Sequence, residues 1–277
     1  MRAELREDIA MARFNRLLIT GAAGNLGGHL RKELAPLATH LRLSDINDMG
    51  EAAPNEEIFQ GDVADADLMM GITKDVDMVI HLGGQANEHT WETVLNANII
   101  GFYNMYEGCR KNGVKRVLWG SSNHAIGFYP REQVIDASVY PRPDTNYGVT
   151  KVFGEGLAQY YWDKYGLETV SIRIGSCFPK PLDRRMLTTW LSYPDLTHLV
   201  ERCLIAPRVA HTVIYGVSDN DAKLWDNHMA AHIGFRPKDN AEVFRAEMEA
   251  ASPEPDPNDA FVALHGGKFA SAPHYED

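Results

Sequence analysis

Short apolar runs alternate with segments of helical periodicity over the first two-thirds of the chain. The runs that predict strands are Arg16–Thr20, Leu41–Ser44, Glu57–Gln60, Met78–Leu82, Arg116–Gly120 and Thr169–Ile174. The segments that predict helices are Asn25–Ala35, Ala66–Thr73, Trp91–Asn112, Tyr147–Tyr165 and Ala241–Ala250. Alternation of this kind predicts an α/β fold, in which helices cover both faces of a doubly wound parallel sheet.

The pattern changes after residue 177. A loop-like stretch at 178–185 precedes a helical pattern at Tyr193–Ala206, and Thr212–Gly216 predicts one more strand. We interpret 13–177 as the main domain. Residues 178–250 are then a small substrate lobe, interleaved with the edge of the sheet.

The two ends of the chain differ from the rest. Residues 1–12 predict a loose N-terminal extension without the apolar run of a signal peptide, and Met11 is an alternative start. The Pro-rich C-terminal tail, 251–277, opens with three prolines, which disfavour helix. It still contains Phe261, Val262, Leu264, Phe269 and Tyr275. We therefore expect the tail to pack on its own fold or on a neighbouring subunit.

Composition narrows the class of protein. The 277 residues are 44% hydrophobic and 23% charged, with a net charge of -11. An acidic balance disfavours binding to nucleic acid or to an anionic membrane surface, and no apolar stretch reaches the ~20 residues of a transmembrane helix. The three cysteines are widely spaced, and the histidines show no ligand-like spacing. We therefore expect a cytoplasmic protein without disulfides and without a metal site.

A glycine-rich turn follows the first predicted strand and opens the first predicted helix. Gly21, Gly24 and Gly27 stand in the run Thr-Gly-Ala-Ala-Gly-Asn-Leu-Gly. Glycines in this context allow a tight turn, close approach to a pyrophosphate and close helix packing. The turn makes 13–177 a Rossmann-type, dinucleotide-binding domain.

Acidic residues at the ends of the next strands refine that prediction. Asp45 ends the second strand, where a carboxylate binds the adenine-ribose hydroxyls and repels a 2'-phosphate, so we predict NAD over NADP. Asp62 could hold the adenine amino group or cap the following helix. The fourth strand ends in His81-Leu82-Gly83-Gly84, where glycines would let the backbone lie against the cofactor.

Tyr147 and Lys151 stand four residues apart on a predicted helix and therefore share a face. An ammonium beside a phenol favours the phenolate and lowers the pKa of the tyrosine. The pair predicts a proton acceptor usable near neutral pH.

These motifs together resemble the extended short-chain dehydrogenase/reductase superfamily from Arg16 to about Ile174. A closer resemblance, from Arg13 to Ala250, is to the uronate dehydrogenase family. Its motifs are Gly120–Pro130, Arg173–Cys177, Arg185–Trp190, Asn220–Asn227, Gly234–Asn240 and Asn98–Asn104. That family oxidises D-glucuronate and D-galacturonate at C1 with NAD to the aldarolactone.

The resemblance implies a role for each matching residue. Ser122, Tyr147 and Lys151 correspond to the catalytic triad. The substrate, a small sugar acid, is then bound by Ser122, Asn123, His124, Tyr147, Ser176 and Arg185, and Arg185 holds its carboxylate. The cofactor residues are Gly21, Gly24, Asn25, Leu26, Gly27, Asp45, Asp62, Val63, Leu82, Gly83, Gly84, Asn98, Ser121, Tyr147, Lys151 and Cys177.

One position departs from the family pattern. Ala86 stands where a serine that touches the sugar is expected, and Gln85 or Asn87 could supply the missing polar group. The preference between glucuronate and galacturonate therefore stays open, as do the anomer and the oligomer size.

Two other functions remain. A sugar epimerase or dehydratase uses the same scaffold, although dehydratases need an acid pair where Asn123 and His124 stand here. A non-catalytic NAD-sensing regulator ranks lower, because such proteins tend to lose the Tyr or the Lys. Helices Trp91–Asn112 and Tyr147–Tyr165 form the usual dimer face of the superfamily, so we expect a homo-oligomer.

Overall fold

The computed structural model describes residues 14–252 and 254–276. Its main sheet has seven parallel strands in the order β3-β2-β1-β4-β5-β6-β9. The strands are β1 (Phe14–Thr20), β2 (Ala38–Asp45), β3 (Glu56–Gln60), β4 (Met78–His81), β5 (Arg116–Ser122), β6 (Glu168–Ile174) and β9 (His211–Gly216). The predicted α/β class and parallel sheet are confirmed, and the strand from the lobe pairs with β6 at the sheet edge.

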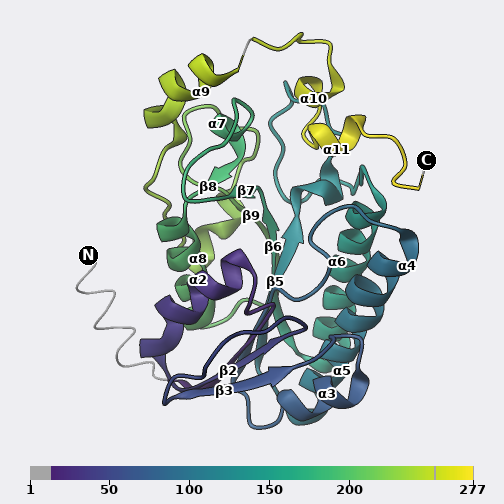
Figure 1. The fold of residues 1–277 in the computed structure, drawn as a ribbon, viewed down its shortest axis with the longest axis vertical. Coiled ribbons are helices and arrows are strands. Elements are labelled where there is room, and N and C mark those ends of the chain that lie inside the picture. The colour runs from purple at the N-terminus through teal and green to yellow at the C-terminus, as the bar shows by residue number, and fades with distance from the viewer. Residues whose placement is uncertain (1–13, 253, 277) are drawn as a thin grey trace.

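Helices cover both faces of this sheet (Figure 1). One face carries α2 (Asn25–Leu34) and α8 (Tyr193–Ile205), whose buried Leu30, Leu34, Leu199 and Cys203 join one apolar core. The other face carries α3 (Ala66–Ile72), α5 (Gly101–Asn112) and α6 (Asn146–Tyr165), over a second core. No helix in the described part of the chain is both long and apolar enough to cross a membrane.

Local capping fixes where the helices begin and end. Asp65, Thr145 and Ser192 each accept a hydrogen bond from a backbone N–H of the first turn of α3, α6 and α8. Gly113 and Gly166 end α5 and α6 in the left-handed conformation that glycine adopts readily. The predicted helix Trp91–Asn112 is present as α4 (Trp91–Val94), a π-helical turn (Leu95–Ile100) and α5.

Shorter elements complete the fold. They are 3₁₀ turns at Ala35–Leu37, Asn123–Ile126, His228–Ile233 and Ala241–Phe244, the two-stranded sheet β7 (Ser176–Cys177) and β8 (Trp190–Leu191), and helices α7 (Met186–Thr189) and α9 (Arg245–Ala251). The predicted helix at Ala241–Ala250 is therefore half 3₁₀ and half α-helical.

The C-terminal tail folds back over the open end of the sheet (Figure 1). It contains α10 (Ala260–Ala263) and α11 (Lys268–Ser271), and Leu264 makes an antiparallel bridge with Pro130. His265 is fully buried, and its ring hydrogen-bonds Trp225 and the carbonyl of Gln133. The tail therefore packs on its own fold, whereas the predicted N-terminal extension lies outside the described residues.

Candidate active site

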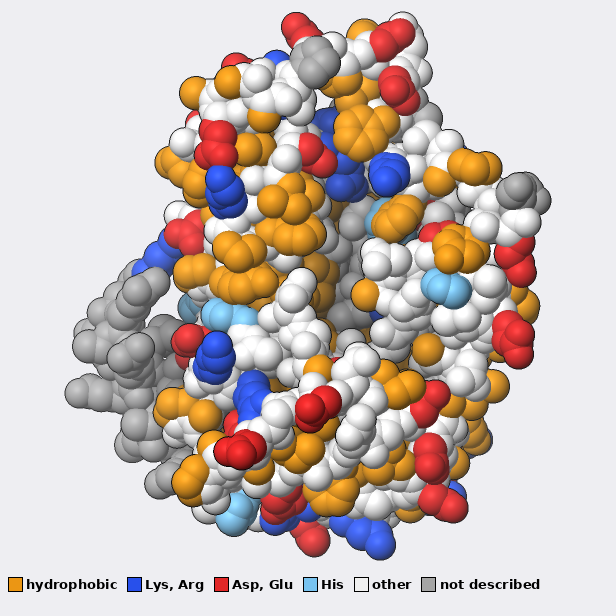
Figure 2. Space-filling view, viewed as in Figure 1, with side chains coloured by type: hydrophobic (Ala, Val, Ile, Leu, Met, Phe, Trp, Pro, Cys, Tyr) orange, Lys and Arg blue, Asp and Glu red, His pale blue; other side chains and the backbone are white. Residues whose placement is uncertain are grey.

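A cavity of about 640 Å³ lies at the carboxyl ends of the parallel strands. In α/β sheets this edge binds ligands where the strand order reverses, which here is between β1 and β4. The space-filling view shows a hollow between the two halves of the molecule, with Lys and Arg side chains at its upper end (Figure 2). The lining comes from the β1–α2 turn, the loop after β4, β5 with its 3₁₀ turn, α6, β7 and the tail.

The glycine turn is too crowded for side chains. Gly21 has a φ of +71°, and a Cβ there would lie 2.6 Å from the carbonyl carbon of Leu82. A Cβ on Gly27 would come within 2.0 Å of the Gly21 oxygen. Gly24 begins α2 without a side-chain cap, and no acidic residue stands in the first turn. The N-terminus of α2 therefore presents backbone N–H groups, which suits the pyrophosphate of a dinucleotide.

Asp45 lies just behind this turn, at the end of β2. Its carboxylate accepts hydrogen bonds from the backbone N–H groups of Ala23 (3.0 Å) and Asn47 (2.9 Å). Two backbone donors on different segments hold the carboxylate in one orientation. The glycine turn and the candidate ribose ligand are thus one rigid unit.

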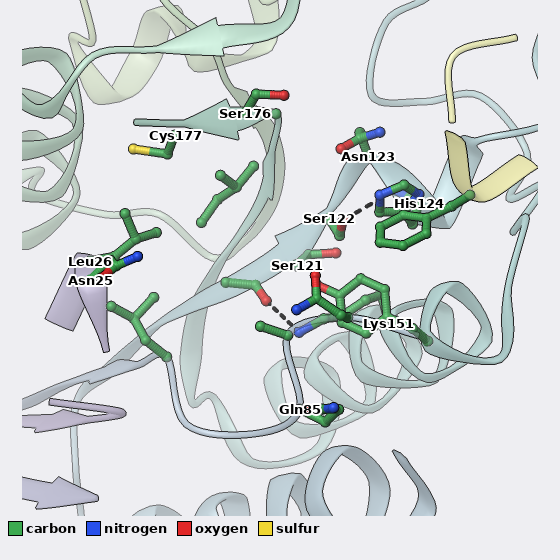
Figure 3. A pocket seen from close by; sticks show the side chains of 18 of the residues that line it. Asn25, Leu26, Gln85, Ser121, Ser122, Asn123, His124, Lys151, Ser176 and Cys177 are labelled. Atoms are coloured by element: carbon green, nitrogen blue, oxygen red, sulfur yellow. Dashed lines mark hydrogen bonds between the residues drawn. The ribbon is translucent and has the colours of Figure 1, made fainter. Parts of the chain in front are cut away.

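Tyr147 and Lys151 project from the first turns of α6 into the cavity, near Ser122 at the end of β5 (Figure 3 labels Lys151 and Ser122). Lys151 Nζ lies 5.1 Å from the centre of the Tyr147 ring and donates to the Gly120 carbonyl at 2.8 Å. The Ser122 hydroxyl is close enough to the phenol to lower its pKa. The structure brings the three predicted catalytic side chains together.

The predicted depression of the tyrosine pKa is wrong for this arrangement. Burial raises the pKa of Tyr147 to about 12 and outweighs the opposing effect of Ser122. Burial also lowers the pKa of Lys151 to about 7, although Glu155 opposes that shift. A buried site disfavours the charged form of both groups, so the lysine offers the phenol less positive charge than spacing alone suggests.

A buried ionic network supports the floor of the site. The carboxylate of Glu155, one helical turn after Lys151, accepts hydrogen bonds from Nε and Nη2 of Arg173 at 2.9 and 2.8 Å. Its Oε1 also accepts the Ser121 hydroxyl at 2.7 Å. Paired charges of this kind fix the facing surfaces of β5, β6 and α6.

Arg185 reaches the cavity from the segment before α7, and its buried Nε atom has no hydrogen-bond partner among the residues that the structure describes. Its Nη2 donates to the His265 carbonyl at 2.6 Å. The side-chain amide of Asn123 can be oriented so that both its oxygen and its nitrogen are hydrogen-bonded. Its oxygen then accepts from Arg185 Nη2 at 3.2 Å, and its nitrogen donates to the Ile174 carbonyl. Burial lowers the pKa of Arg185. A buried guanidinium with an unpaired donor is suited to an anionic ligand.

His124 faces the cavity from the 3₁₀ turn after β5. Its Nδ1 lies 2.9 Å from Oδ2 of Asp144, and burial lowers its pKa despite this carboxylate. Across the cavity, the Ser176 hydroxyl contacts Thr189 Oγ1 at 3.0 Å. Burial raises the pKa of Cys177, which makes that thiol a poor nucleophile. The part of the chain described here contains no cluster of three or more His, Cys, Asp or Glu residues that could hold a metal.

Comparisons with known proteins agree with this chemistry. The model of the NAD-dependent epimerase/dehydratase family matches residues 17–192. A uronate dehydrogenase from Pseudomonas putida is 52% identical over 260 residues, which cover 94% of this chain and 97% of that protein. The chain belongs to the uronate dehydrogenases.

Solved structures of this family have the same fold. The glucuronic acid dehydrogenase of Chromohalobacter salexigens superposes with a TM-score of 0.93 at 49% identity, covering 95% of this chain and 99% of that one. A mutant of the Agrobacterium tumefaciens uronate dehydrogenase, complexed with NAD, superposes with a TM-score of 0.92 at 47% identity. That superposition covers 94% of this chain and 98% of the mutant.

Most of the predicted site residues line the cavity. They are Gly21, Gly24, Asn25, Leu26, Gly27, Leu82, Gly83, Gly84, Ala86, Ser121, Ser122, Asn123, His124, Tyr147, Lys151, Ser176, Cys177 and Arg185. In Figure 3, Asn25 and Leu26 lie on one side, near Cys177, and Asn123 and His124 on the other.

Four predicted cofactor residues are not part of that lining: Asp45, Asp62, Val63 and Asn98. Asp62 accepts from the N–H of Ala64, and the helix cap of α3 is Asp65 instead. A Cβ on Gly83 would lie 2.9 Å from Val63, which therefore packs beneath the loop after β4.

Asn98 lies in the π-helical turn with its amide fully engaged. The amide pairs with both backbone groups of Gln85 and with the Thr150 hydroxyl. Asn98 therefore shapes the loop after β4.

The sequence did not predict the contribution of the tail or of two acidic residues. Phe261, Gly266, Lys268 and Phe269 line the cavity, and the Phe269 ring lies 4.2 Å from the His124 ring. The Glu88 carboxylate accepts a hydrogen bond from the backbone N–H of Tyr147 at 2.7 Å, and the Asp144 carboxylate is hydrogen-bonded to His124 Nδ1. The apolar residues of the tail predicted packing but not its location.

Proposed function

We propose that the chain oxidises a hexuronate, D-glucuronate or D-galacturonate, at C1 with NAD and forms the aldarolactone. The observation that carries the proposal is the shared cavity of Tyr147, Lys151 and Ser122 with the buried, incompletely paired Arg185. The first three residues are suited to removing a hydroxyl proton, and the arginine to holding a carboxylate.

The cofactor side of the cavity comes from the domain 13–177. The free N–H groups at the start of α2 would hold the pyrophosphate, and Asp45 would bind the adenine ribose, which favours NAD. When bound, NAD supplies the hydride acceptor. Lys151, Ser121 and Cys177 would border the nicotinamide half of the cofactor. Asp62, Val63 and Asn98 would contact the cofactor or shape the loops that hold it.

The proton step belongs to Tyr147. As a phenolate, its oxygen takes the proton of the anomeric hydroxyl, while the Ser122 hydroxyl hydrogen-bonds and orients the same oxygen. Lys151 supports the phenolate charge. Because burial raises the pKa of Tyr147 to about 12, the rate should increase with pH on the alkaline side of neutrality.

The lobe at 178–250 and the tail at 251–277 complete the substrate side. Arg185 would grip the carboxylate, and Asn123, His124 and Ser176 would bind the ring hydroxyls and the carboxylate. Ala86 offers no hydrogen bond where the family has a serine. Gln85 lies beside it on the cavity wall and can supply a polar group there.

The test is the absorbance of NADH at 340 nm, with purified protein, NAD and either uronate. Glucose and galactose are the controls without a carboxylate. NADH formed only from uronates supports the proposal, and Tyr147→Phe should then reduce kcat by roughly two to four orders of magnitude. Near-normal turnover in that variant would remove Tyr147 from the proton step.

The epimerase or dehydratase reaction is the second candidate. The dehydratase reaction is disfavoured because Asn123 and His124 provide no acid pair beside Ser122, and His124 is already paired with Asp144. An epimerase keeps NAD bound and releases no net NADH. Absence of NADH from every sugar, in a protein that binds NAD, would favour it and direct the search to phosphorylated or nucleotide-linked substrates.

We further assign the protein to the cytoplasm and expect a homo-oligomer. Cys109, Cys177 and Cys203 are free thiols, which suits a reducing compartment. The predicted dimer face exposes an apolar row on α5 and α6 and the turn before α5: Ile100, Tyr103, Val149, Phe153 and Tyr160. Sedimentation should give at least a dimer, and a monomer at micromolar concentration would contradict this expectation.

A further inference from the structure

Asp144 is a buried carboxylate that no part of the proposed reaction uses. Its side chain has 0% exposure and lies in the loop just before α6. Three glycines from separate parts of the chain enclose it. A Cβ on Gly127 or on Gly266 would come within 1.8 Å of Oδ2, and a Cβ on Gly148 within 3.3 Å of Oδ1. The tail thus seals the carboxylate against the 3₁₀ turn that carries His124.

The contacts of Asp144 are few and specific. His124 Nδ1 lies 2.9 Å from Oδ2 and 3.1 Å from Oδ1, and the Thr145 hydroxyl donates to Oδ1 at 3.2 Å. An ionised carboxylate only accepts hydrogen bonds, so the proton of a neutral His124 ring lies on Nδ1. Nε2 then carries a lone pair.

The ring of His124 cannot easily turn away from this geometry. Phe269 packs edge-on against it at 4.2 Å, and the Tyr147 ring lies 5.9 Å away. The backbone N–H of His124 donates to the Ser122 hydroxyl, which links the histidine to the proposed catalytic serine (Figure 3). Both neighbours of the ring belong to the cavity lining.

We propose that Asp144 is a positioning residue that holds His124 as the Nδ1–H tautomer, so that Nε2 accepts a hydrogen bond from a hydroxyl of the sugar. The use of that acceptor rests on the proposed function, whereas the tautomer itself does not. A histidine held in this way selects a substrate with a hydroxyl at that place, because a deoxy analogue would leave Nε2 unpaired.

The same arrangement predicts a pH limit. A protonated His124 has no lone pair on Nε2 and no longer accepts from the hydroxyl, so the contact chosen by the neutral tautomer is lost on the acid side. The charged and titratable groups that face the ring are Asp144, Glu88, Arg185 and Tyr147. Burial and Arg185 lower the pKa of His124, and the two carboxylates raise it. Removal of the Asp144 charge should therefore move the acid limb of kcat/KM to lower pH.

The direct test is the histidine side-chain ¹⁵N NMR spectrum of the wild-type holoprotein near neutral pH. The His124 resonances are assigned by their loss in His124→Gln. The expected result is a pyrrole-like Nδ1 and a pyridine-like Nε2. The opposite assignment would overturn the proposal, whatever the activity on uronates.

Asp144→Asn, which conserves the shape of the side chain, tests the consequence. We expect a loss of about ten-fold or more in kcat/KM, the size of one charge-assisted hydrogen bond, and an acid limb at lower pH. In the His124→Gln background the same substitution should cause almost no further loss of kcat/KM, since Asp144 binds the substrate only through His124. A change that remains there should be a gain, because the Asp144 carboxylate also raises the pKa of Tyr147. Additive losses in this cycle, or an unmoved acid limb, would count against the proposal.

Asp195→Asn is the matched control. Asp195 is equally a buried aspartate, but its partners are Ser218 and the backbone of Lys238 and Asp239, outside the cavity lining. Its substitution should lower the melting temperature without moving the acid limb or the His124 tautomer. A shift of the acid limb in the control would mean that the limb responds to any loss of stability of the fold. The inference drawn from Asp144→Asn would then fail.

Discussion

Arg185 Nη2 donates to the carbonyl oxygen of His265 at 2.6 Å, which joins the candidate carboxylate ligand to the C-terminal tail. The Nε atom of the same guanidinium is buried, and no group in the described part of the chain accepts a hydrogen bond from it. Arg185→Ala should therefore raise the KM for uronates by about 10- to 100-fold, the effect of losing a charge-assisted contact. The catalytic efficiency with neutral sugars should change far less.

The neighbouring arginine provides the control for that prediction. Arg184 donates to the carbonyls of Ser252 and Glu249, and it is not among the residues lining the cavity. Arg184→Ala should leave the KM for uronates within about two-fold, because the hydrogen bonds of Arg184 lie outside the cavity and do not reach the substrate site. Equal losses with uronates and neutral sugars in Arg185→Ala would argue against recognition of the carboxylate.

Asp45 is the proposed determinant of cofactor preference. Asp45→Arg would remove the proposed acceptor for the ribose hydroxyls and add a partner for a 2'-phosphate. The ratio of kcat/KM for NAD to that for NADP should fall by roughly 10- to 100-fold. Asp48→Arg is the control, since the exposed carboxylate of Asp48 accepts one hydrogen bond within the described residues, from the N–H of Gly50. An unchanged ratio in Asp45→Arg would exclude this residue from the choice of cofactor.

The sheet could be predicted because each strand carries its own local pattern. The apolar runs predicted the first six strands to within a few residues of their observed ends. The run at Thr212–Gly216 predicted the seventh strand, and the structure places it beside β6. The π-helical turn at Leu95–Ile100 could not be predicted, because apolar periodicity does not distinguish it from α-helix. Asn98 lies in that turn and reaches Gln85 across the fold, a contact that only tertiary structure reveals.

The candidate site was predictable where residues follow strands or share a helix face. The glycine turn follows a strand, and Tyr147 and Lys151 share a helix face. Asp144 lies 20 residues from His124 in sequence, and no periodic pattern connects them. The pKa of Tyr147 depends on how much of the cavity is closed to water, and sequence spacing carries no information about burial.

Lys151 makes the stability of the fold depend on pH. Its pKa falls from 10.5 to about 7 on burial, so the unfolded chain binds more protons between these values. The cost of burying the lysine is therefore absent above pH 10.5, grows as the pH falls, and is complete below about pH 7. Lys151→Met removes it, so its gain in melting temperature over the wild type should be larger at pH 7 than at pH 10.

Thermal unfolding across this pH range checks the sign. Lys115→Met, at an exposed position before β5, is the control and should show no such trend. A gain for Lys151→Met that is constant with pH would mean that the lysine does not lose its proton on folding. A gain that increases with pH would reverse the sign and contradict the burial argument.

The tail should stabilise both the fold and the site. Deletion of 254–277 removes His265, which leaves the indole N–H of Trp225 without its partner and Arg185 Nη2 without the His265 carbonyl. A buried donor left unpaired costs about 1–3 kcal/mol, and each kcal/mol corresponds to roughly 2–4 °C in a protein of this size. We expect a lower melting temperature and a higher KM for uronates together. Deletion of 273–277 alone, which keeps His265, should preserve the KM. An unchanged melting temperature after the longer deletion would show that the packing of the tail contributes nothing to stability.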